Sequence, residues 1–303
     1  MNVAILGSGF GLYGYLPALH ALSCRIMLPA RYRSTIERRP ELSQLASHVT
    51  FVADENDAID LADAVVIARR PADQLDLIPS LLHRQKLQRL LLEKPLAPNP
   101  AAALRLEDQI AASGKIVRTG YLFGYTGWGR DLIARAAELN GDLHIRWRFR
   151  AHHYAADLSN WKRADAEGGG ALRFYGIQLI SLLAALGFDQ IEASRLKAVR
   201  PGGAESWHAT LATRKGARCF VELDSNAAQS LFAVTAPALG VAISRQDPFD
   251  AVSGSGDRRV PLLVSLCREF LTVETTTDPS DRKAISLWQA IEAVTVFENA
   301  AAL

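Results

Sequence analysis

The first 120 residues alternate between short apolar runs and segments whose apolar positions have helical spacing. Continuous apolar runs of this length are typical of strands buried on both faces, and residues 64–68 are the clearest because β-branched side chains dominate there. Helical spacing recurs between the runs, as at residues 78–82 and 101–112. The pattern predicts a parallel sheet with helices on both sides. The predicted strands are residues 3–6, 25–28, 50–52, 64–68, 90–92 and 116–117.

The pattern changes after Gly120, where longer β-rich runs lie close together along the chain. Clustered strands predict an antiparallel or mixed sheet, so the second half is expected to form an α+β domain. The domains are therefore expected at residues 1–121 and 122–303. The predicted strands of the second domain are residues 143–150, 194–199, 207–213, 218–223, 230–235 and 240–244, and its predicted helices are residues 131–138, 171–186, 260–272 and 282–300.

Composition narrows the class of protein. A chain of 303 residues fits two domains, and 49% hydrophobic with 22% charged residues is ordinary globular usage. A formal charge of +2 gives no electrostatic footprint for a nucleic-acid partner. Its three cysteines are far apart and form no CxxC pair, so we expect no metal site and a reducing compartment.

Residues 2–24 carry no Lys, Arg, Asp or Glu, a run long enough to resemble a membrane span. Four glycines and Pro17 interrupt the run, and no basic residue precedes it as a signal peptide would require. The better interpretation is a buried strand, a glycine turn and a buried helix. We therefore expect a soluble, cytoplasmic protein with no membrane partner.

A glycine-rich turn directly follows the first predicted strand. A tight strand-to-helix turn needs one residue without Cβ, and the approach of a pyrophosphate to backbone N–H groups needs another. Gly7 and Gly9 occupy these positions, while the third glycine position of the dinucleotide-binding fingerprint is Leu12. The turn predicts a dinucleotide site, and its candidate cofactor-binding residues are Gly7, Gly9, Phe10, Gly11 and Leu12.

The end of the second predicted strand bears on the choice of cofactor. An acidic residue there would hydrogen-bond the adenosine ribose and favour NAD. No carboxylate occurs before Glu37, whereas Arg31 and Arg33 offer guanidinium groups suited to a 2′-phosphate and Ser34 offers a further donor. The sequence favours NADP and leaves NAD possible; the alternative is that both arginines belong to a solvated loop.

A Glu93-Lys94-Pro95 motif at the end of a short apolar strand, downstream of a glycine turn, resembles the Gfo/Idh/MocA oxidoreductase family. Other segments resemble the same family over nearly the whole chain. These segments are residues 17–19, 64–71, 120–121, 161–162 and 168–172.

The resemblance implies an N-terminal Rossmann domain and a C-terminal α+β domain with an open-faced, mostly antiparallel sheet. It also implies a substrate that lies against the nicotinamide, commonly a sugar, a cyclitol or a nucleotide-linked sugar. Lys94 takes the place of the family's catalytic lysine, where an ammonium group can donate to the reacting oxygen and stabilise a developing alkoxide. The further cofactor-binding candidates are Ala68, Arg69, Arg70, Glu93 and Lys94, of which the two arginines could hold a phosphate or an anionic substrate.

The predicted active-site helix departs from the family. Phe174 and Gln178 stand where the family usually carries an Asp and, four residues later, a His. Neither can act as a general base, so the sequence favours reduction of a carbonyl over oxidation of an alcohol. The remaining catalytic candidates beside Lys94 are Tyr175, Gln178 and His153.

Three functions stay open. The first is an NADP(H)-dependent reductase of a carbohydrate-like carbonyl, with Lys94 as the central donor. The second is a cofactor-binding protein with a regulatory or binding role and little catalysis, and the third is a reductase of an imine or a non-sugar carbonyl. We also expect a homodimer or higher homo-oligomer, formed by an uncovered sheet face that would carry Val221, Leu223, Phe232 and Val234.

Overall fold

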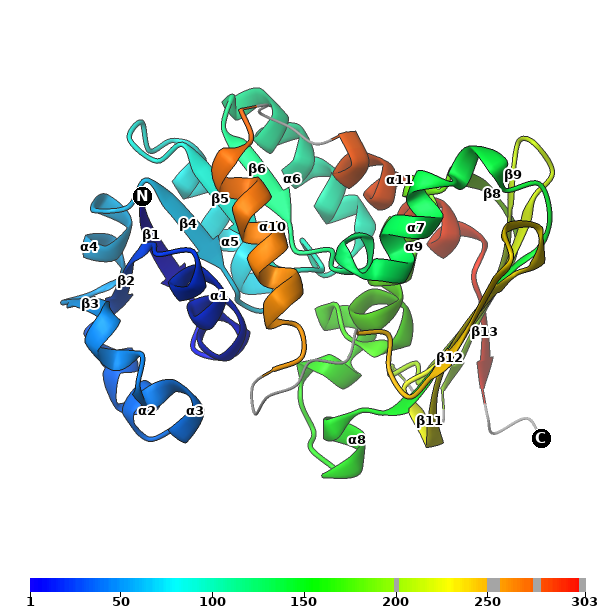
Figure 1. Cartoon of the computed structure of the whole chain (residues 1–303), viewed down its shortest axis with the longest axis horizontal. Helices are drawn as coiled ribbons and strands as arrows, with labels where there is room; N and C mark the ends of the chain where they lie inside the picture. Colours follow the sequence, from blue (N-terminus) through cyan, green and yellow to red (C-terminus); the bar gives the residue numbers. More distant parts are fainter. Residues whose placement is uncertain (199–201, 250–256, 275–278, 300–303) are drawn as a thin grey trace. The chain divides into compact units, whose positions relative to one another are not determined.

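The computed structural model describes residues 1–198, 202–249, 257–274 and 279–299 (Figure 1). The chain forms two compact units, and each is described by itself. The first unit holds residues 1–96, 105–125 and the described part of 251–278, and the second holds residues 97–104, most of 126–250 and the described residues after 278.

A six-stranded parallel sheet forms the centre of the first unit, in the order β3-β2-β1-β4-β5-β6. This is the strand order of a Rossmann fold, in which ligands bind at the carboxyl ends of the strands near the point where the order reverses. The central strand β4 is fully buried, which explains its continuous apolar sequence. The strands are β1 (Asn2–Leu6), β2 (Arg25–Pro29), β3 (Val49–Val52), β4 (Ala64–Ile67), β5 (Arg89–Leu92) and β6 (Ile116–Thr119).

Helices connect these strands. The first helix begins with a π-helical turn, η1 (Gly11–Tyr15), directly after the glycine turn. The α-helices are α1 (Leu16–Ala21), α2 (Arg33–Glu37), α3 (Pro40–Ser43), α4 (Glu55–Asp60), α5 (Pro71–Leu82) and α6 (Pro100–Ser113), and the 3-10 turns are η2 (Ala30–Tyr32), η3 (Ala46–His48) and η4 (Phe123–Tyr125).

The first unit also includes a helix from the C-terminal part of the chain. The helix α10 (Val260–Thr272) packs against α1, η1, β5 and β6, and Arg89 Nη1 donates to the carbonyl oxygens of Phe270 and Val273 at 2.8 and 2.7 Å. The sequence pattern assigned these residues to the second domain because they follow its strands in the chain. Their apolar face is instead buried against the nucleotide-binding fold.

The second unit contains a seven-stranded mixed sheet in the order β12-β11-β7-β10-β9-β8-β13. Neighbouring strands are antiparallel except for the pairs β7–β10 and β8–β13. The strands are β7 (Leu143–Arg150), β8 (Phe188–Ala198), β9 (Ser206–Thr213), β10 (Arg218–Asp224), β11 (Asn226–Ala236), β12 (Val241–Arg245) and β13 (Val296–Asn299). The predicted α/β fold class, a Rossmann domain followed by an α+β domain, is confirmed.

Helices lie along one face of this sheet (Figure 1). The α-helices of the unit are α7 (Gly127–Ala134), α8 (His152–Ala155), α9 (Ile177–Ala185) and α11 (Pro279–Val294). The shorter turns are η5 (Ala136–Glu138), η6 (Trp161–Arg163), η7 (Asp165–Glu167), η8 (Ala171–Gly176) and η9 (Pro237–Leu239). The helix predicted at residues 282–300 ends early, because residues 296–299 form β13 beside β8; Ala300 lies outside the described residues.

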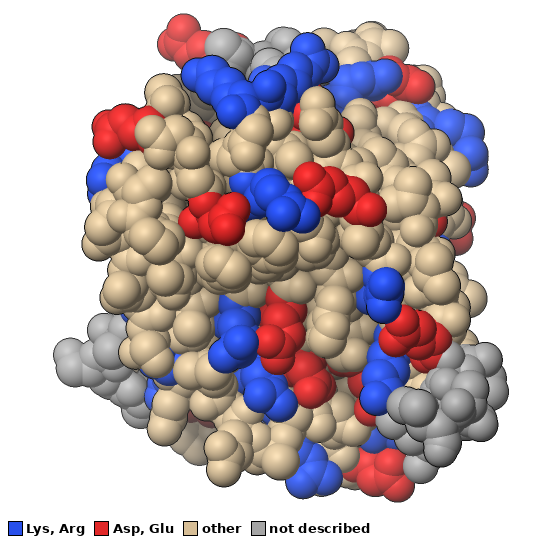
Figure 2. All heavy atoms as spheres, turned by 90° about the vertical axis from the view of Figure 1, so that its right-hand side faces the viewer, with Lys and Arg blue, Asp and Glu red and all other residues tan. Residues whose placement is uncertain are grey.

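The open face of the sheet is polar, which corrects one expectation. Val221, Leu223, Phe232 and Val234 are all buried, at most 4% exposed, so they lie on the helix-covered face and not on the open one. Strand β7 alternates strictly between buried and exposed positions over most of its length, as a half-covered sheet requires. Figure 2 shows interspersed basic and acidic side chains on the open side. The Arg146–Glu222 ion pair joins the neighbouring strands β7 and β10.

Candidate active site

The glycine turn after β1 has the geometry that a dinucleotide site needs. Gly7 has φ +138°, and a Cβ there would lie 2.1 Å from the carbonyl oxygen of Ala68 on the neighbouring strand end. A Cβ on Gly9 would meet no atom within 4 Å, so this part of the turn faces open space. The backbone between Gly9 and Leu12 can therefore be approached closely, and the first residues of η1 follow immediately.

A polar cluster lies beside this turn at the carboxyl ends of β2, β3 and β4. The Gly7 N–H donates to the Tyr32 hydroxyl at 3.2 Å, and that hydroxyl donates to Glu55 at 3.3 Å. Arg31 and Arg69 both form ion pairs with the same Glu55 carboxylate. Two of the predicted phosphate ligands, Arg31 and Arg69, are thus already paired with one carboxylate. This acidic residue follows β3, whereas the acid that selects the cofactor was expected after β2.

The other cofactor candidates near this cluster have different surroundings. Arg33 lies over the Phe51 ring at 4.1 Å and is 3.9 Å from Glu37, so it belongs to the exposed side of α2. Ser34 is exposed, and its carbonyl oxygen accepts from Arg38. Arg70 is exposed and precedes the first residue of α5. The structure therefore brings Arg31 and Arg69 together and leaves Arg33 and Arg70 apart from them.

The Glu93-Lys94-Pro95 motif follows β5 directly, and the Lys94–Pro95 peptide bond is cis. The Glu93 carboxylate is buried and accepts from the Tyr15 hydroxyl at 2.7 Å. Burial raises the pKa of Glu93, which Lys94, the Tyr15 hydrogen bond and Arg259 partly oppose. The pKa of Tyr15 is also raised, first by burial and then by the Glu93 charge. Lys94 itself is half-buried.

Arg259, at the start of α10, adds a buried charge beside the glycine turn. Its guanidinium lies over the Phe10 ring at 4.1 Å and is held by two hydrogen bonds to Asp257, at 2.9 and 2.6 Å. Burial opposes this charge, but the hydrogen bonds and charge of Asp257 raise the pKa of Arg259 overall. The arginine therefore stays cationic next to a turn suited to a pyrophosphate.

In the second unit, the predicted active-site helix begins with the π-helical turn η8 and continues as α9. π-turns of this kind are frequent at functional sites. Gly170 precedes the turn with φ +74°, and a Cβ there would lie 1.8 Å from the Asp165 carboxylate. The close approach of these two segments thus requires glycine.

Aromatic side chains surround the positions where the family carries its Asp. The rings of Phe174 and Tyr175 are 4.7 Å apart, Tyr175 is 4.8 Å from Phe149, and Phe174 is 5.2 Å from Trp161. All four rings are half-buried. Phe174, which stands where the family usually carries an Asp, therefore belongs to an aromatic cluster that also includes Tyr175. Gln178 is buried one turn further on.

His153 joins this cluster from α8. Its ring is stacked with Tyr175 at 6.2 Å, it is 3% exposed, and its Nε2 has no hydrogen-bond partner. Burial lowers its pKa to about 4, helped by the positive charges of Lys162, Arg163 and His152. His153 is accordingly a neutral imidazole near pH 7, which makes it a weak base and not a cationic acid.

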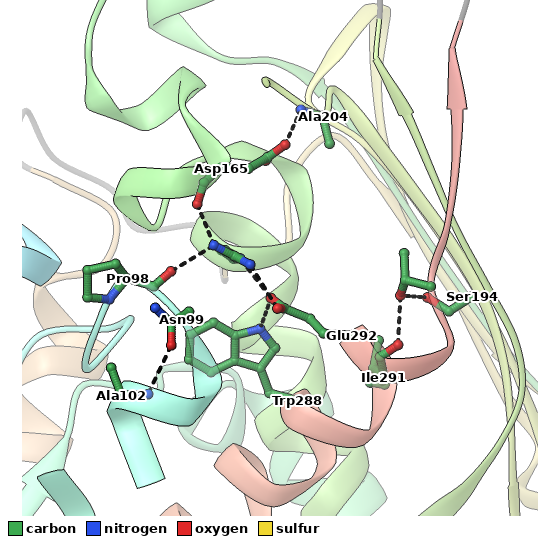
Figure 3. A network of polar contacts seen from close by, with 11 residues as sticks. Pro98, Asn99, Ala102, Asp165, Ser194, Ala204, Trp288, Ile291 and Glu292 are labelled. Atoms are coloured by element: carbon green, nitrogen blue, oxygen red, sulfur yellow. Dashed lines mark hydrogen bonds and ion pairs between the residues drawn. The ribbon is translucent and has the colours of Figure 1, made fainter. Parts of the chain in front are cut away.

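Arg173 ties the predicted active-site helix into a polar network that includes Pro98, Asp165, Trp288 and Glu292, which Figure 3 labels. Its guanidinium donates to the carbonyl oxygens of Pro98 and Asp165, at 3.1 and 2.7 Å, and to both carboxylate oxygens of Glu292 on α11. Trp288 donates to the same carboxylate at 2.7 Å. The network ties the helix to the residues that follow the Glu93-Lys94-Pro95 motif in the chain, and it fixes the backbone next to Phe174.

Reasoning from sequence missed two groups of residues. Tyr15 and Gln74 hydrogen-bond the Glu93-Lys94-Pro95 motif, and Tyr32, Glu55 and Arg259 lie beside the glycine turn. Gln74 carries a recognisable signal, since it shares the helical spacing of Pro71, Ile78 and Leu81 on the buried face of α5. A polar residue on an apolar stripe needs an internal partner. Arg259 has no such signal because the glycine turn beside it lies near the start of the chain.

The sequence of residues 1–121 matches the model of the Gfo/Idh/MocA family, described as an oxidoreductase family with an NAD-binding Rossmann fold. The match confirms the predicted resemblance over these residues, and with it the class of NAD(P)-dependent oxidoreductases. No curated protein matches the chain by sequence.

Solved structures share the fold of nearly the whole chain. KijD10, a 3-ketoreductase from Actinomadura kijaniata solved with NADP and TDP-benzene, is 16% identical with a TM-score of 0.70, and the match covers 98% of each chain. The WlbA (WbpB) dehydrogenase from Thermus thermophilus, solved with NAD and UDP-GlcNAcA, is 17% identical with a TM-score of 0.68 over 95% of this chain and 94% of that one. GenD2 from gentamicin A biosynthesis, solved with NAD, is 15% identical with a TM-score of 0.66 over 96% and 92%.

Two further findings concern sites that the described residues do not form. Within the described ranges, no group of three His, Cys, Asp or Glu side chains is placed to hold a metal ion. None of the helices described is long and apolar enough to cross a bilayer.

Proposed function

Because its first 121 residues belong to the Gfo/Idh/MocA oxidoreductase family, we propose that this chain is an NADP(H)-dependent reductase of a keto group on a sugar or nucleotide-linked sugar. The observation that carries the proposal is the intact Glu93-Lys94-Pro95 motif, braced by buried hydrogen bonds beside a glycine turn of the required geometry.

The first unit supplies groups for the pyrophosphate and for the adenosine end of a dinucleotide. Gly7 allows the close packing of the turn against Ala68, Gly9 leaves the backbone open to a pyrophosphate, and Arg259 adds a fixed positive charge near Phe10. Arg31 and Arg69 converge on Glu55, where a 2′-phosphate would offer a stronger acceptor than the carboxylate. We therefore propose NADP(H) as the preferred cofactor, with NAD(H) as the weaker one.

Lys94 is the proposed donor to the substrate. A bound reduced nicotinamide supplies the hydride, and the task left to the protein is to stabilise the negative charge that develops on the carbonyl oxygen. An ammonium group can donate a hydrogen bond to that oxygen and then its proton. The Glu93 carboxylate next to Lys94 accepts from the Tyr15 hydroxyl, which fixes its position in the motif.

The second unit favours reduction over oxidation. Phe174 cannot accept a proton from an alcohol, Gln178 is not a base, and His153 is only weakly basic. Tyr175 is a phenol in the aromatic cluster and is the proposed second donor. Half-buried aromatic rings also suit the apolar face of a sugar ring or a nucleotide base.

The substrate proposal takes its class from the similar structures. KijD10 is a 3-ketoreductase solved with a TDP derivative, and WlbA was solved with a UDP-sugar. A keto group on a nucleotide-linked sugar is therefore the first class to test. The likeness establishes the fold, and the activity of this chain rests on the motif.

The proposal is tested with NADPH and a panel of TDP- and UDP-linked keto sugars, following the absorbance of the reduced nicotinamide. We expect Lys94→Ala to lower turnover by about 100-fold, the usual scale for loss of an acid–base or oxyanion group. NADPH affinity should change little, because the glycine turn and arginines remain. Unchanged turnover in Lys94→Ala would refute the donor assignment, and NADPH binding without any turnover would favour a regulatory cofactor-binding protein.

A further inference from the structure

The Gln74 side chain contacts the backbone of the Glu93-Lys94-Pro95 motif on both sides of the lysine. Its Nε2 donates to the carbonyl oxygen of Glu93 at 2.8 Å and to that of Pro95 at 3.1 Å. Its Oε1 accepts from the Glu93 N–H at 3.1 Å. The side chain is fully buried, at 0% exposure, although it comes from the first turn of α5.

The amide of Gln74 is fully used by these contacts. Both N–H groups of Nε2 have a carbonyl partner, and Oε1 has an N–H partner, so only one orientation of the amide fits. A buried amide with all of its polar groups paired is held in one position, and it restricts the movement of the backbone groups to which it is hydrogen-bonded.

We propose that Gln74 is a positioning residue for Lys94. Because it holds the carbonyls of residues 93 and 95, it fixes the backbone from which the Lys94 side chain departs. Catalytic groups lose rate steeply when they are displaced, by about 100-fold for a 1 Å error. This inference rests on the proposed role of Lys94, but the positioning itself can be measured without catalysis.

Two variants separate the hydrogen bonds of Gln74 from its volume. Gln74→Met keeps the length of the side chain and removes all three hydrogen bonds. Gln74→Glu keeps the shape and the acceptor for the Glu93 N–H but offers no donor pair for the two carbonyls. The matched control is Ile78→Val, a small loss of volume on the same buried face of α5 and away from the motif.

The readout that does not depend on activity is the titration of Lys94. Lysines are labelled by reductive ¹³C-methylation, and the Lys94 signal is identified by its loss in Lys94→Arg. We expect Gln74→Met and Gln74→Glu to shift the apparent pKa of Lys94 by about half a unit or more, or to broaden its signal, since its surroundings change. The other lysine signals and the Ile78→Val spectrum should stay as in the wild type.

Kinetics provide the second readout. In both Gln74 variants we expect kcat to fall by at least about 10-fold while the NADPH Kd stays within about 3-fold. An unchanged Lys94 titration in both variants would overturn the proposal, as would a loss of kcat that Ile78→Val shares. If Lys94→Ala keeps full turnover, the proposed donor role fails instead, and the Lys94 titration still decides whether Gln74 positions the lysine.

Discussion

Glu55 holds two arginines that a nucleotide phosphate would otherwise attract. The side chains of Arg31 and Arg69 meet at this one carboxylate, and Arg31 is largely exposed. Ion pairs of this kind contribute only about 0–1 kcal/mol, so a phosphate with two negative charges can displace the carboxylate. The balance between Glu55 and a 2′-phosphate therefore sets how strongly the site prefers NADPH.

We predict that Glu55→Gln raises the affinity for NADPH by about 3- to 10-fold, which corresponds to about 1 kcal/mol. Affinity for NADH should stay level or fall, because the ribose loses an acceptor. Titration by nicotinamide fluorescence at low salt measures both constants. The control is Glu37→Gln, which removes the partner of Arg33 and leaves Arg31 and Arg69 as they are. If Glu55→Gln weakened NADPH binding, the carboxylate would be a ligand of the cofactor and not its competitor.

The same cluster shows why residues in this region were only partly predictable. Arg31 was identified because it follows β2, and the structure places it at the edge expected of a Rossmann fold. Its partner Glu55 follows β3, 24 residues later, and the sequence gives no sign of that pairing. Polar contacts between distant residues depend on the order and register of the strands, and the pattern of apolar residues does not determine either.

At the scale of elements, α8 carries a buried histidine that ties stability to pH. His153 has its pKa lowered to about 4 by burial and by Lys162, Arg163 and His152, whereas an unfolded histidine titrates near 6.5. Between these values the unfolded chain binds the extra proton and the folded chain does not. The stability that this group contributes is therefore complete above about pH 6.5 and is lost as the pH falls toward 4.

We predict that His153→Gln removes this dependence. The melting temperature of the wild type should fall further than that of the variant between about pH 7.5 and pH 4.5. Asp165 titrates in the opposite sense, since burial raises its pKa to about 6, but it is present in both proteins and cancels in the comparison. His208→Gln, an exposed histidine on β9, is the control. If acidification lowered the melting temperatures of the wild type and of His153→Gln equally, His153 would not be the titrating group.

The elements themselves were largely predictable, and the exceptions have physical causes. The strands of the first sheet were found because each is a continuous apolar run between turn signals. The last helix was predicted to run to residue 300, but it ends at Val294. No Gly or Pro marks this end in the sequence, and the residues after it, Val296 and Phe297, pair with β8. The π-turn η8 was also not expected, since one extra residue in a turn leaves no mark in the apolar pattern.

At the scale of the whole molecule, the question is how the open face of the second sheet is used. The apolar side chains first assigned to this face are buried beneath the helices. The face that remains carries ion pairs across its strands, including Arg146–Glu222 and Arg218–Glu192. Figure 2 shows basic and acidic side chains close to one another on this side. Such a surface can pair with a second copy mainly through polar and charged contacts, and the edge strand β13 adds the exposed apolar side chains of Val296 and Phe297.

We predict a two-fold dimer through this face whose stability depends on salt. A self-complementary surface of mixed charge can meet itself across a two-fold axis, with basic groups of one copy opposite acidic groups of the other. Light scattering at micromolar concentration should give a dimer mass at low salt and a falling average mass as the salt is raised, because exposed charge pairs are screened. Arg146→Glu should weaken the dimer, since it places a second negative charge beside Glu222, whereas Arg38→Glu on the first unit should not. A monomer under all salt conditions would refute the dimer, and a dimer that resists salt and tolerates Arg146→Glu would place the interface elsewhere on the chain.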